Sequence, residues 1–211
     1  MKITRRIAVL TLATALILPA APQAQGVSAA DQALVAKAQA YLQSLAQAKG
    51  RFTQTDPRGG TSGGDLFIRR PGKARFAYDA PKSLLIVSDG RLVSVWDPRL
   101  KSFNNYPLSS TPLALFLDKD IKLQNGVEVT GVHRIAGGFV IDARDGKKQA
   151  RGSVTLTFTD APVRLVEWTV TDPQGGRTRV RIDSLAPTSG LSDDMFELRN
   201  PLRPKPGQML H

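Results

Sequence analysis

Side chains that commonly carry out catalysis are scarce in this chain. It has no cysteine and two histidines, His133 within an extended pattern and His211 at the C-terminus. A Ser-His-Asp triad would have to use His133, and no nucleophile elbow lies near it. With no cysteine and so few histidines, a zinc site of the usual kind is not expected either. We therefore expect no metal site and no cofactor.

Carboxylates are the other candidates for acid–base chemistry. A glycosidase-like pair could be drawn from Asp65, Asp79, Asp89 and Asp97. Three of the four fall at strand ends or turns, where aspartate is common for structural reasons. The sequence therefore favours a protein that is not an enzyme.

Two further patterns are tested as candidate binding sites. The glycines at 59, 60, 63 and 64 precede neither Lys-Ser/Thr nor a helix start, so they indicate a hairpin loop and not a phosphate loop. Arg177, Arg179 and Arg181 alternate with other residues and form a basic row on one strand face. Such a row suits an acidic partner or lipid phosphates, or it is the solvated outside of the sheet. Of these two readings, the sequence favours the solvated outside of the sheet.

These side chains must be positioned by the rest of the chain, most of which is predicted to be extended. One amphipathic helix is predicted from Asp31 to about Ala48, where Ser28 and Asp31 resemble a capping box and Gly50 follows the last turn. Its apolar face must cover another element. From Phe52 onward the apolar period is two, and turn signals separate short runs. We expect eleven or twelve antiparallel strands, near 52–56, 65–70, 74–79, 83–88, 92–97, 101–106, 127–135, 139–144, 153–158, 163–170, 177–184 and 195–199.

A second helix interrupts the strands. The segment Ser109 to Asp120 places Thr111 at an N-cap and Pro112 at the first helical position. Its leucines and phenylalanine make it apolar nearly all round, so it must be buried. A sheet of so many strands curls or closes, and we expect the two helices to cover or plug it.

Several early strands are apolar on both faces, as in Leu66-Phe67-Ile68 and Phe76-Ala77-Tyr78. A sheet with one exposed face alternates apolar and polar residues instead. Either these strands lie between two covering layers, or their concave side is an apolar cavity. Both structures produce the same pattern, and taken alone the pattern favours ordinary core over a cavity.

The N-terminus is typical of an export signal. Residues 1–24 combine Lys2, Arg5 and Arg6 with an apolar stretch and small residues, and the cleavage site falls between 24 and 30. One domain, 25–211, would remain, too small for two comfortable cores. Without the signal the chain has 26 basic and 18 acidic residues, a net charge of +8 that favours anionic partners or simply solubility. Export makes nucleic acid an improbable partner.

The order of motifs from Arg51 to Pro98, followed by the helix that starts at Thr111-Pro112, resembles the LolA family of periplasmic lipoprotein carriers. The matching pieces are Phe52-x-Gln54, Gly64-x-Leu66, Arg70-Pro71-Gly72, Arg75-Phe76-x-Tyr78, Pro81, Val87-Ser88-Asp89-Gly90, Trp96-Asp97-Pro98 and Thr111-Pro112. The likeness continues more weakly to Phe196. It implies an unclosed antiparallel β-barrel of about eleven strands under an α-helical lid, enclosing a cavity for acyl chains.

The resemblance also implies a function and its partners. Such a carrier is a monomeric periplasmic chaperone that takes lipoproteins released by an inner-membrane ABC transporter and delivers them to an outer-membrane acceptor. That acceptor is itself a lipoprotein and needs a lipidation cysteine, which this chain lacks. The alternative is a sensor module of the same fold that binds a free lipid or lipopeptide and reports it to a partner.

Individual site residues follow from the same resemblance. Arg70 corresponds to an arginine that hydrogen-bonds the lid and holds the empty cavity shut, and Arg69 would then point the other way. A planar guanidinium suits such a role because it donates several hydrogen bonds. Family placement and strand alternation give the residues expected to line the cavity: Leu66, Ile68, Phe76, Tyr78, Trp96, Leu113, Phe116 and Leu117.

Overall fold

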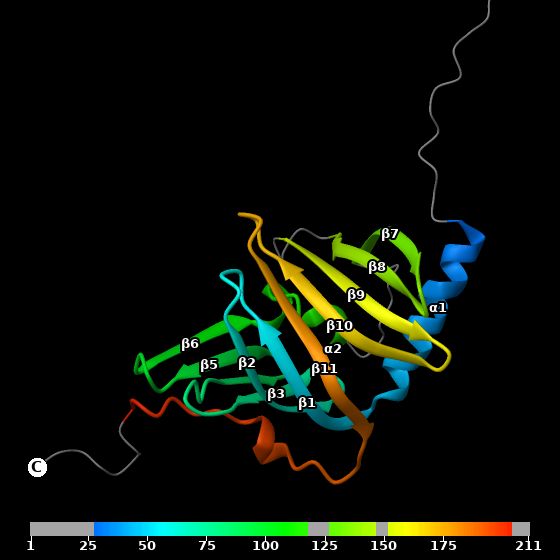
Figure 1. Ribbon diagram of the computed structural model, residues 1–211. Helices are drawn as coiled ribbons and strands as arrows, with labels where there is room; N and C mark the ends of the chain where they lie inside the picture. The colour runs from blue at the N-terminus through cyan, green and yellow to red at the C-terminus, as the bar shows by residue number, and fades with distance from the viewer. Residues whose placement is uncertain (1–27, 118–126, 147–151, 204–211) are drawn as a thin grey trace, which may run out of the picture.

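A computed structural model describes residues 28–117, 127–146 and 152–203, and shows one antiparallel sheet of eleven strands (Figure 1). The strand order is β6-β5-β4-β3-β2-β1-β11-β10-β9-β8-β7. Because β6 and β7 are opposite edges, the sheet is curved but not closed, as predicted. The strands are β1 (Gln47–Thr55), β2 (Thr61–Arg69), β3 (Lys73–Tyr78), β4 (Leu85–Asp89), β5 (Leu92–Asp97), β6 (Ser102–Pro107), β7 (Val127–Ile135), β8 (Gly138–Asp145), β9 (Ser153–Asp160), β10 (Val163–Thr171) and β11 (Arg177–Pro187).

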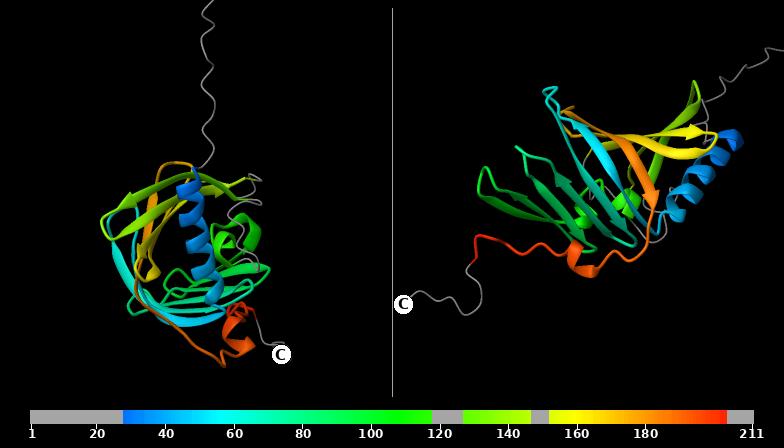
Figure 2. Two further views of the ribbon diagram at one scale, coloured as in Figure 1. Left: turned by 90° about the vertical axis from the view of Figure 1, so that its right-hand side faces the viewer. Right: turned by 60° about the horizontal axis from the view of Figure 1, so that its bottom comes forward.

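The predicted N-terminal helix is present as α1 (Ala29–Ser44) and lies inside the curve of the sheet (Figure 2). Ser28 is its N-cap, and the hydroxyl oxygen accepts a hydrogen bond from the Asp31 amide, as the capping-box pattern predicted. The buried face of α1 packs against β7 and β10. The helix is shorter than the expected 31–48 because β1 already begins at Gln47, paired with β2 and β11.

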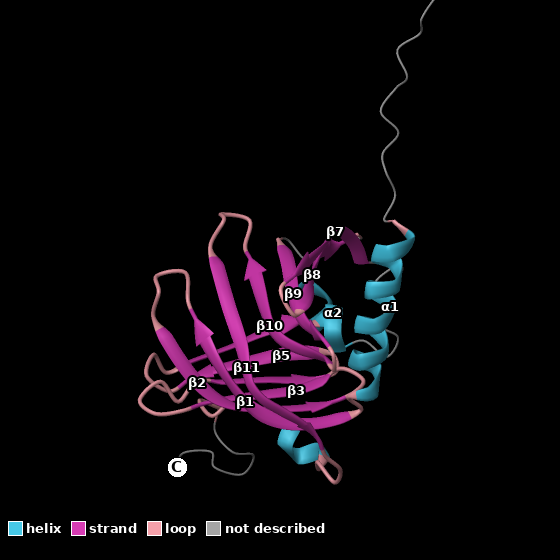
Figure 3. Cartoon of the chain, turned by 45° about the vertical axis from the view of Figure 1, so that its right-hand side comes forward, coloured by secondary structure: helices cyan, strands magenta, loops and turns pink. Residues whose placement is uncertain are grey.

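The second predicted helix is reduced to two short pieces within the described residues. They are a 3₁₀ turn, η1 (Leu108–Ser110), and one turn of α-helix, α2 (Ala114–Leu117). Both lie with α1 on the concave side of the sheet (Figure 3). Residues 118–120, which the prediction included, lie outside the described residues, as does the predicted export signal at 1–24.

Bulges in β10 and β11 bend the half of the sheet that follows α2. Arg51 of β1 pairs with Ser184, whereas Phe52 pairs with Ile182, so Asp183 is an extra residue in β11. Val166 is the extra residue between the pairs made by Leu165 and Glu167 in β10. A bulge increases local twist and bends its strand. These two bulges therefore help to wrap the sheet around the helices.

The concave face carries the main core. Residues that face each other on paired strands point to the same side, which places Leu66, Phe76 and Ile86 together on the concave face. Phe52 makes edge-to-face contacts there with Phe76 and Tyr78, with ring centroids 5.5 and 5.0 Å apart. Such aromatic pairs stabilise the fold beyond the contribution of the apolar area that they bury. The core is continuous with the buried face of α1.

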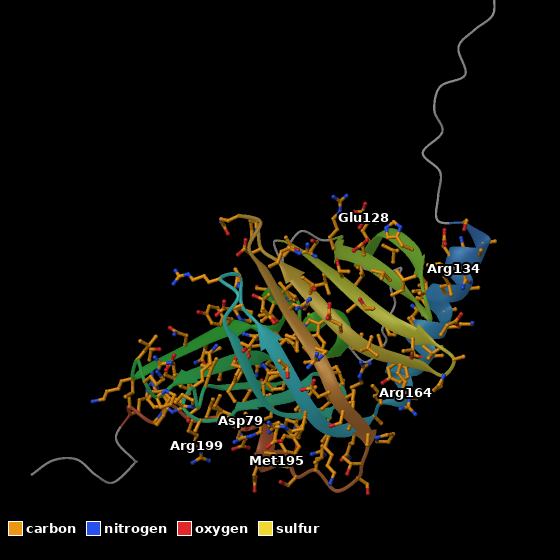
Figure 4. All side chains as sticks on the ribbon, viewed as in Figure 1. Asp79, Glu128, Arg134, Arg164, Met195 and Arg199 are labelled. Carbon is orange, nitrogen blue, oxygen red and sulfur yellow. The ribbon has the colours of Figure 1, made fainter. Side chains whose placement is uncertain are left out.

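The convex face of β2, β3 and β4 is covered by a C-terminal segment, residues 188–199, which we call the strap. Its 3₁₀ turn, η2 (Asp193–Phe196), contacts β3 and β4, and Phe196 is buried. The Arg75 guanidinium donates a hydrogen bond to the Met195 carbonyl at 3.0 Å, and Figure 4 shows Met195 outside the sheet. The expected strand at 195–199 is therefore wrong, because this segment crosses the sheet face and pairs with no edge.

The strap resolves the question of strands that are apolar on both faces. Leu66 and Ile68 point to the concave core, while Phe67, Arg75 and Val87 share the convex face that the strap crosses. Val87 is 1% exposed although it points away from the main core. Both readings left open by the sequence thus hold: one face borders a cavity and the other lies under a covering layer. No helix in the described ranges is long and apolar enough to cross a bilayer.

Candidate functional site

A small apolar cavity lies between the concave face and the two helices. Its volume is about 20 Å³, room for about one water molecule. It is bordered by residues of the α1 end, of α2 and of four strands: Leu42, Leu45, Leu66, Ile68, Arg70, Ala74, Phe76, Leu113, Leu117, Leu165, Trp168, Ile182 and Leu185. An engineered cavity that admits benzene measures about 150 Å³. This cavity, as the described residues form it, is therefore closed and has no room for an acyl chain.

The structure brings five of the eight expected lining residues to this cavity: Leu66, Ile68, Phe76, Leu113 and Leu117. The side chain of Phe116 lies outside the described residues. Tyr78 is on the concave face but away from the cavity, and its hydroxyl donates to the Gln54 side-chain oxygen at 2.6 Å. Burial raises the pKa of Tyr78 to about 12, so the phenol stays neutral.

Trp96 does not border the cavity, contrary to the expectation. It pairs with Leu85, which pairs with Ala77, whereas Val95 pairs with Ile86 on the concave side. Trp96 therefore lies on the convex face. The register of the β4–β5 hairpin decides its side, and a shift of one residue would reverse it.

Sequence reasoning missed the contribution of the other half of the sheet. Leu165 and Trp168 of β10, and Ile182 and Leu185 of β11, border the cavity together with Leu42 and Leu45 of the α1 region. The apolar face of α1 was a usable signal, because it had to cover something. The residues on β10 and β11 were harder to find, since each strand contains a bulge that breaks the period of two.

Among the described residues that line the cavity, Arg70 is the one that carries a charge. Its Nε and Nη1 atoms are buried, and within residues 28–117, 127–146 and 152–203 neither has a hydrogen-bond partner. Burial lowers the pKa of Arg70 to about 10, so the group still carries its proton at neutral pH. The expected hydrogen bonds from these two atoms to the lid are not present in the described part of the chain.

A larger, open groove of about 500 Å³ lies beside the closed cavity. Leu117 borders both spaces, and Pro71 and Gly72, which follow Arg70 directly, border the groove. Leu117 and the turn after Arg70 thus form part of the wall between them. The groove is more polar than the cavity, with Asp89, Arg91 and Ser109 among the residues that line it.

A backbone hydrogen bond holds α2, which forms the lid together with α1, to this wall. The Gly72 amide donates to the Leu117 carbonyl at 2.7 Å. Gly72 has a φ of +76°, and a Cβ atom there would lie 2.6 Å from the Cα of Gly90. Glycine is therefore required at this position by conformation and by space.

We expect Gly72→Ala to destabilise the fold by roughly 2–4 kcal/mol, because a left-handed conformation and a backbone clash add together. Gly59→Ala is the matched control, since Gly59 has a φ of +85° but a Cβ atom added there would meet nothing within 4 Å. It should cost about 1 kcal/mol. Urea unfolding measures both. Equal losses would show that the approach to Gly90 does not constrain this turn.

The other candidate groups do not assemble into a catalytic site. Asp65 and Asp79 both accept hydrogen bonds from Arg51, and the bond from Arg51 to Asp79 lowers the pKa of Asp79, the opposite of what a general acid needs. His133 is exposed and lies 3.2 Å from an Asp142 oxygen. No group of three potential metal ligands occurs in the described ranges.

The basic row of β11 lies on the convex face. Arg181 pairs with Asp183 at 3.0 Å, and Arg179 lies 3.8 Å from Glu167. Exposed ion pairs of this kind contribute little to stability. Their position agrees with a solvated outer face, and their binding role stays untested.

Comparison with known proteins shows which family this chain is similar to. The profile of the family "Outer membrane lipoprotein carrier protein LolA" matches residues 43–199. Outer-membrane lipoprotein carrier proteins of Pseudomonas syringae pv. syringae and pv. tomato are 30% and 29% identical, each over 90% of this chain and 93% of its own length.

One solved structure is similar in fold, and this similarity supports the fold but not the function. A DUF1329 family protein from Desulfovibrio piger superposes with a TM-score of 0.51 at 12% identity, covering 79% of this chain and 96% of that chain. The sequence matches carry the assignment, since the family match spans all eleven strands, the turn at Arg70-Pro71-Gly72 and α2. The chain belongs to the LolA family of outer-membrane lipoprotein carrier proteins.

Proposed function

We propose that this protein is a periplasmic carrier that binds the acyl chains of lipoproteins on the concave face of its sheet and delivers them to the outer membrane. The observation that carries the proposal is an apolar concave face closed by two helices, in a member of a family named for this task. The family name describes a carrier and not an enzyme.

Cargo entry requires the lid to move. The closed cavity of about 20 Å³ is far smaller than an acyl chain, so α2 or the end of α1 must be displaced. Each methylene of the cargo that becomes buried contributes about 0.8 kcal/mol to binding. This gain offsets the contacts between the helices and the sheet that are lost on opening. The short α2, held to the wall by the Gly72–Leu117 hydrogen bond, is the element we expect to move first.

The cavity residues described above are proposed to contact the acyl chains once the lid is open. Arg70 is proposed to be the gate, by a mechanism that differs from the one implied by the resemblance. A cation whose buried Nε and Nη1 lack acceptors among the described residues raises the free energy of the closed, empty state. It therefore lowers the cost of opening, instead of holding the lid shut through Nε and Nη1.

We further propose an inner-membrane ABC transporter as the donor and an outer-membrane lipoprotein acceptor as the recipient, with the carrier acting as a monomer. The test uses inner-membrane vesicles that contain the transporter, a labelled lipoprotein and ATP. We expect the purified protein to bring the lipoprotein into solution as a one-to-one complex. If free lipopeptide binds but no lipoprotein leaves the vesicles, the carrier role fails and a lipid-sensing role gains support.

A further inference from the structure

Arg70 is out of place in the cavity that it borders. The other twelve described lining residues are leucine, isoleucine, alanine, phenylalanine or tryptophan. Arg70 brings a delocalised positive charge and five N–H donors into this apolar setting. Two of its nitrogen atoms, Nε and Nη1, are buried and without acceptors throughout the described part of the chain.

Neighbouring arginines of the same strands show what this chain does when an acceptor is available. Arg69 donates to the Leu191 carbonyl at 3.1 Å and pairs with Asp193 at 3.1 Å, on the convex face. Arg75 donates to the Met195 carbonyl at 3.0 Å. Both are satisfied by backbone carbonyls of the strap, whereas Arg70 faces the cavity, where its two buried atoms meet no such oxygen among the described residues.

Unsatisfied buried donors are costly, and a cation costs more than a neutral group. An acceptor that arrives with a ligand would remove this cost in the bound state only. The arrangement therefore favours a ligand that carries hydrogen-bond acceptors at the depth of Arg70. A pure hydrocarbon would fill the cavity but would leave Nε and Nη1 of Arg70 without hydrogen-bond acceptors.

The position of Arg70 shows which part of the ligand this would be. It lies where the apolar cavity meets the wall formed by Pro71, Gly72 and Leu117, and the polar groove lies beyond that wall. An amphipathic ligand would place its hydrocarbon in the cavity and its polar head in the groove. The groups at the junction of an acyl chain and its head are ester or amide carbonyls.

We propose that Arg70 binds the carbonyl oxygens at the heads of the acyl chains, so that the protein recognises its cargo as acylated and not merely as apolar. This inference rests on the proposed carrier function and adds a specificity-determining residue to it. A guanidinium can hold two carbonyl oxygens at once because its donors diverge in one plane. Two oxygens would be available when two ester-linked chains enter together.

The test compares two probes that differ by one carbonyl oxygen. A monoacylglycerol of medium chain length and the alkylglycerol ether of equal length share the same head and nearly the same hydrocarbon. Affinities are measured by displacement of a fluorescent fatty probe at concentrations where both remain monomeric. Because a hydrogen bond from a charged donor is stronger than a neutral one, wild type should prefer the ester by about 10- to 100-fold.

Variants separate recognition by Arg70 from a purely structural role. In Arg70→Leu the ester-to-ether ratio should fall to about one, and Arg70→Lys, which keeps a donor, should recover part of it. Arg69→Leu is the matched control, because Arg69 points to the strap, and it should keep the wild-type ratio. Thermal unfolding confirms that each variant is folded before binding is measured.

A spectroscopic readout checks the contact itself. The infrared carbonyl band of a ¹³C-labelled ester should shift to lower frequency on binding wild type and should not shift with Arg70→Leu. Equal ester and ether affinities in wild type, or an unchanged ratio in Arg70→Leu, would overturn the inference while leaving the carrier function intact. Failure of wild type to bind either probe would instead count against the carrier function.

Discussion

Arg70→Leu is expected to raise the melting temperature of the empty protein and to slow its uptake of acylated ligands. Leucine removes a charge whose buried Nε and Nη1 lack partners in the described residues and places a smaller apolar side chain against the apolar cavity. Replacing buried charged groups by apolar ones is often stabilising, by roughly 1–4 kcal/mol. In a chain of this size each 1 kcal/mol shifts the melting temperature by about 2–4 °C. The lid of the variant closes over a wholly apolar cavity, so it should open less often.

Circular dichroism melts and stopped-flow binding measure the two effects. Arg69→Leu is again the control, and it should lower the melting temperature because it breaks the contacts with Leu191 and Asp193. A lower melting temperature for Arg70→Leu would mean that Arg70 holds the lid shut, as the family resemblance implied. The two mechanisms thus predict opposite signs for one measurement.

The pH dependence of this difference has a defined sign. Burial lowers the pKa of Arg70 in the folded state to about 10, below its value in the unfolded chain. Between these two pKa values the unfolded state binds more protons, so stability rises with pH there. The destabilisation caused by Arg70 is complete below pH 10 and declines above it. The melting temperatures of wild type and Arg70→Leu should therefore converge above pH 10.

Leu185→Asn is expected to weaken acyl-ligand binding by about tenfold or more. Leu185 borders the cavity, and a buried amide without a partner costs roughly 1–3 kcal/mol. Leu85→Asn makes the same nearly isosteric change on the convex face, because Leu85 pairs with Ala77 and Trp96 and not with the concave row. It should leave the affinity within about twofold of wild type, since it touches no ligand.

Displacement titration of a fluorescent fatty probe gives both affinities, and urea unfolding gives both stabilities. Similar losses of stability with different losses of affinity would locate the binding face. If Leu85→Asn weakens binding as much as Leu185→Asn, the ligand does not lie on the concave side.

Much of the fold follows from the sequence because its signals are local. The capping pattern at Ser28 marks the start of α1, and alternation with tight turns marks the strands. The opposite orientations of Arg69 and Arg70 also follow from alternation, and the structure confirms that Arg69 points to the strap. Leu66, Ile68 and Phe76 border the same cavity, and their contact with acyl chains stays a prediction from family placement and alternation.

The predictions that the structure contradicts depend on pairing between strands or segments, which the local sequence pattern does not reveal. Trp96 was assigned to the wrong face because hairpin register, not alternation within one strand, decides which way a residue points relative to its neighbours. Ile182 and Leu185 border the same cavity at a spacing of three, which a bulge at Asp183 allows. Phe196 looked like part of a strand because an apolar residue beneath a covering segment and one in a strand give the same local pattern.

Photo-cross-linking of a bound acyl chain tests the central claim most directly. A lipopeptide with a diazirine in the middle of one acyl chain is bound to the purified protein and irradiated, and the adducts are located by mass spectrometry. The account predicts adducts on residues that border the closed cavity, such as Leu66, Phe76, Trp168 and Leu185. Adducts on the convex face or the strap, with none in the cavity, would contradict it.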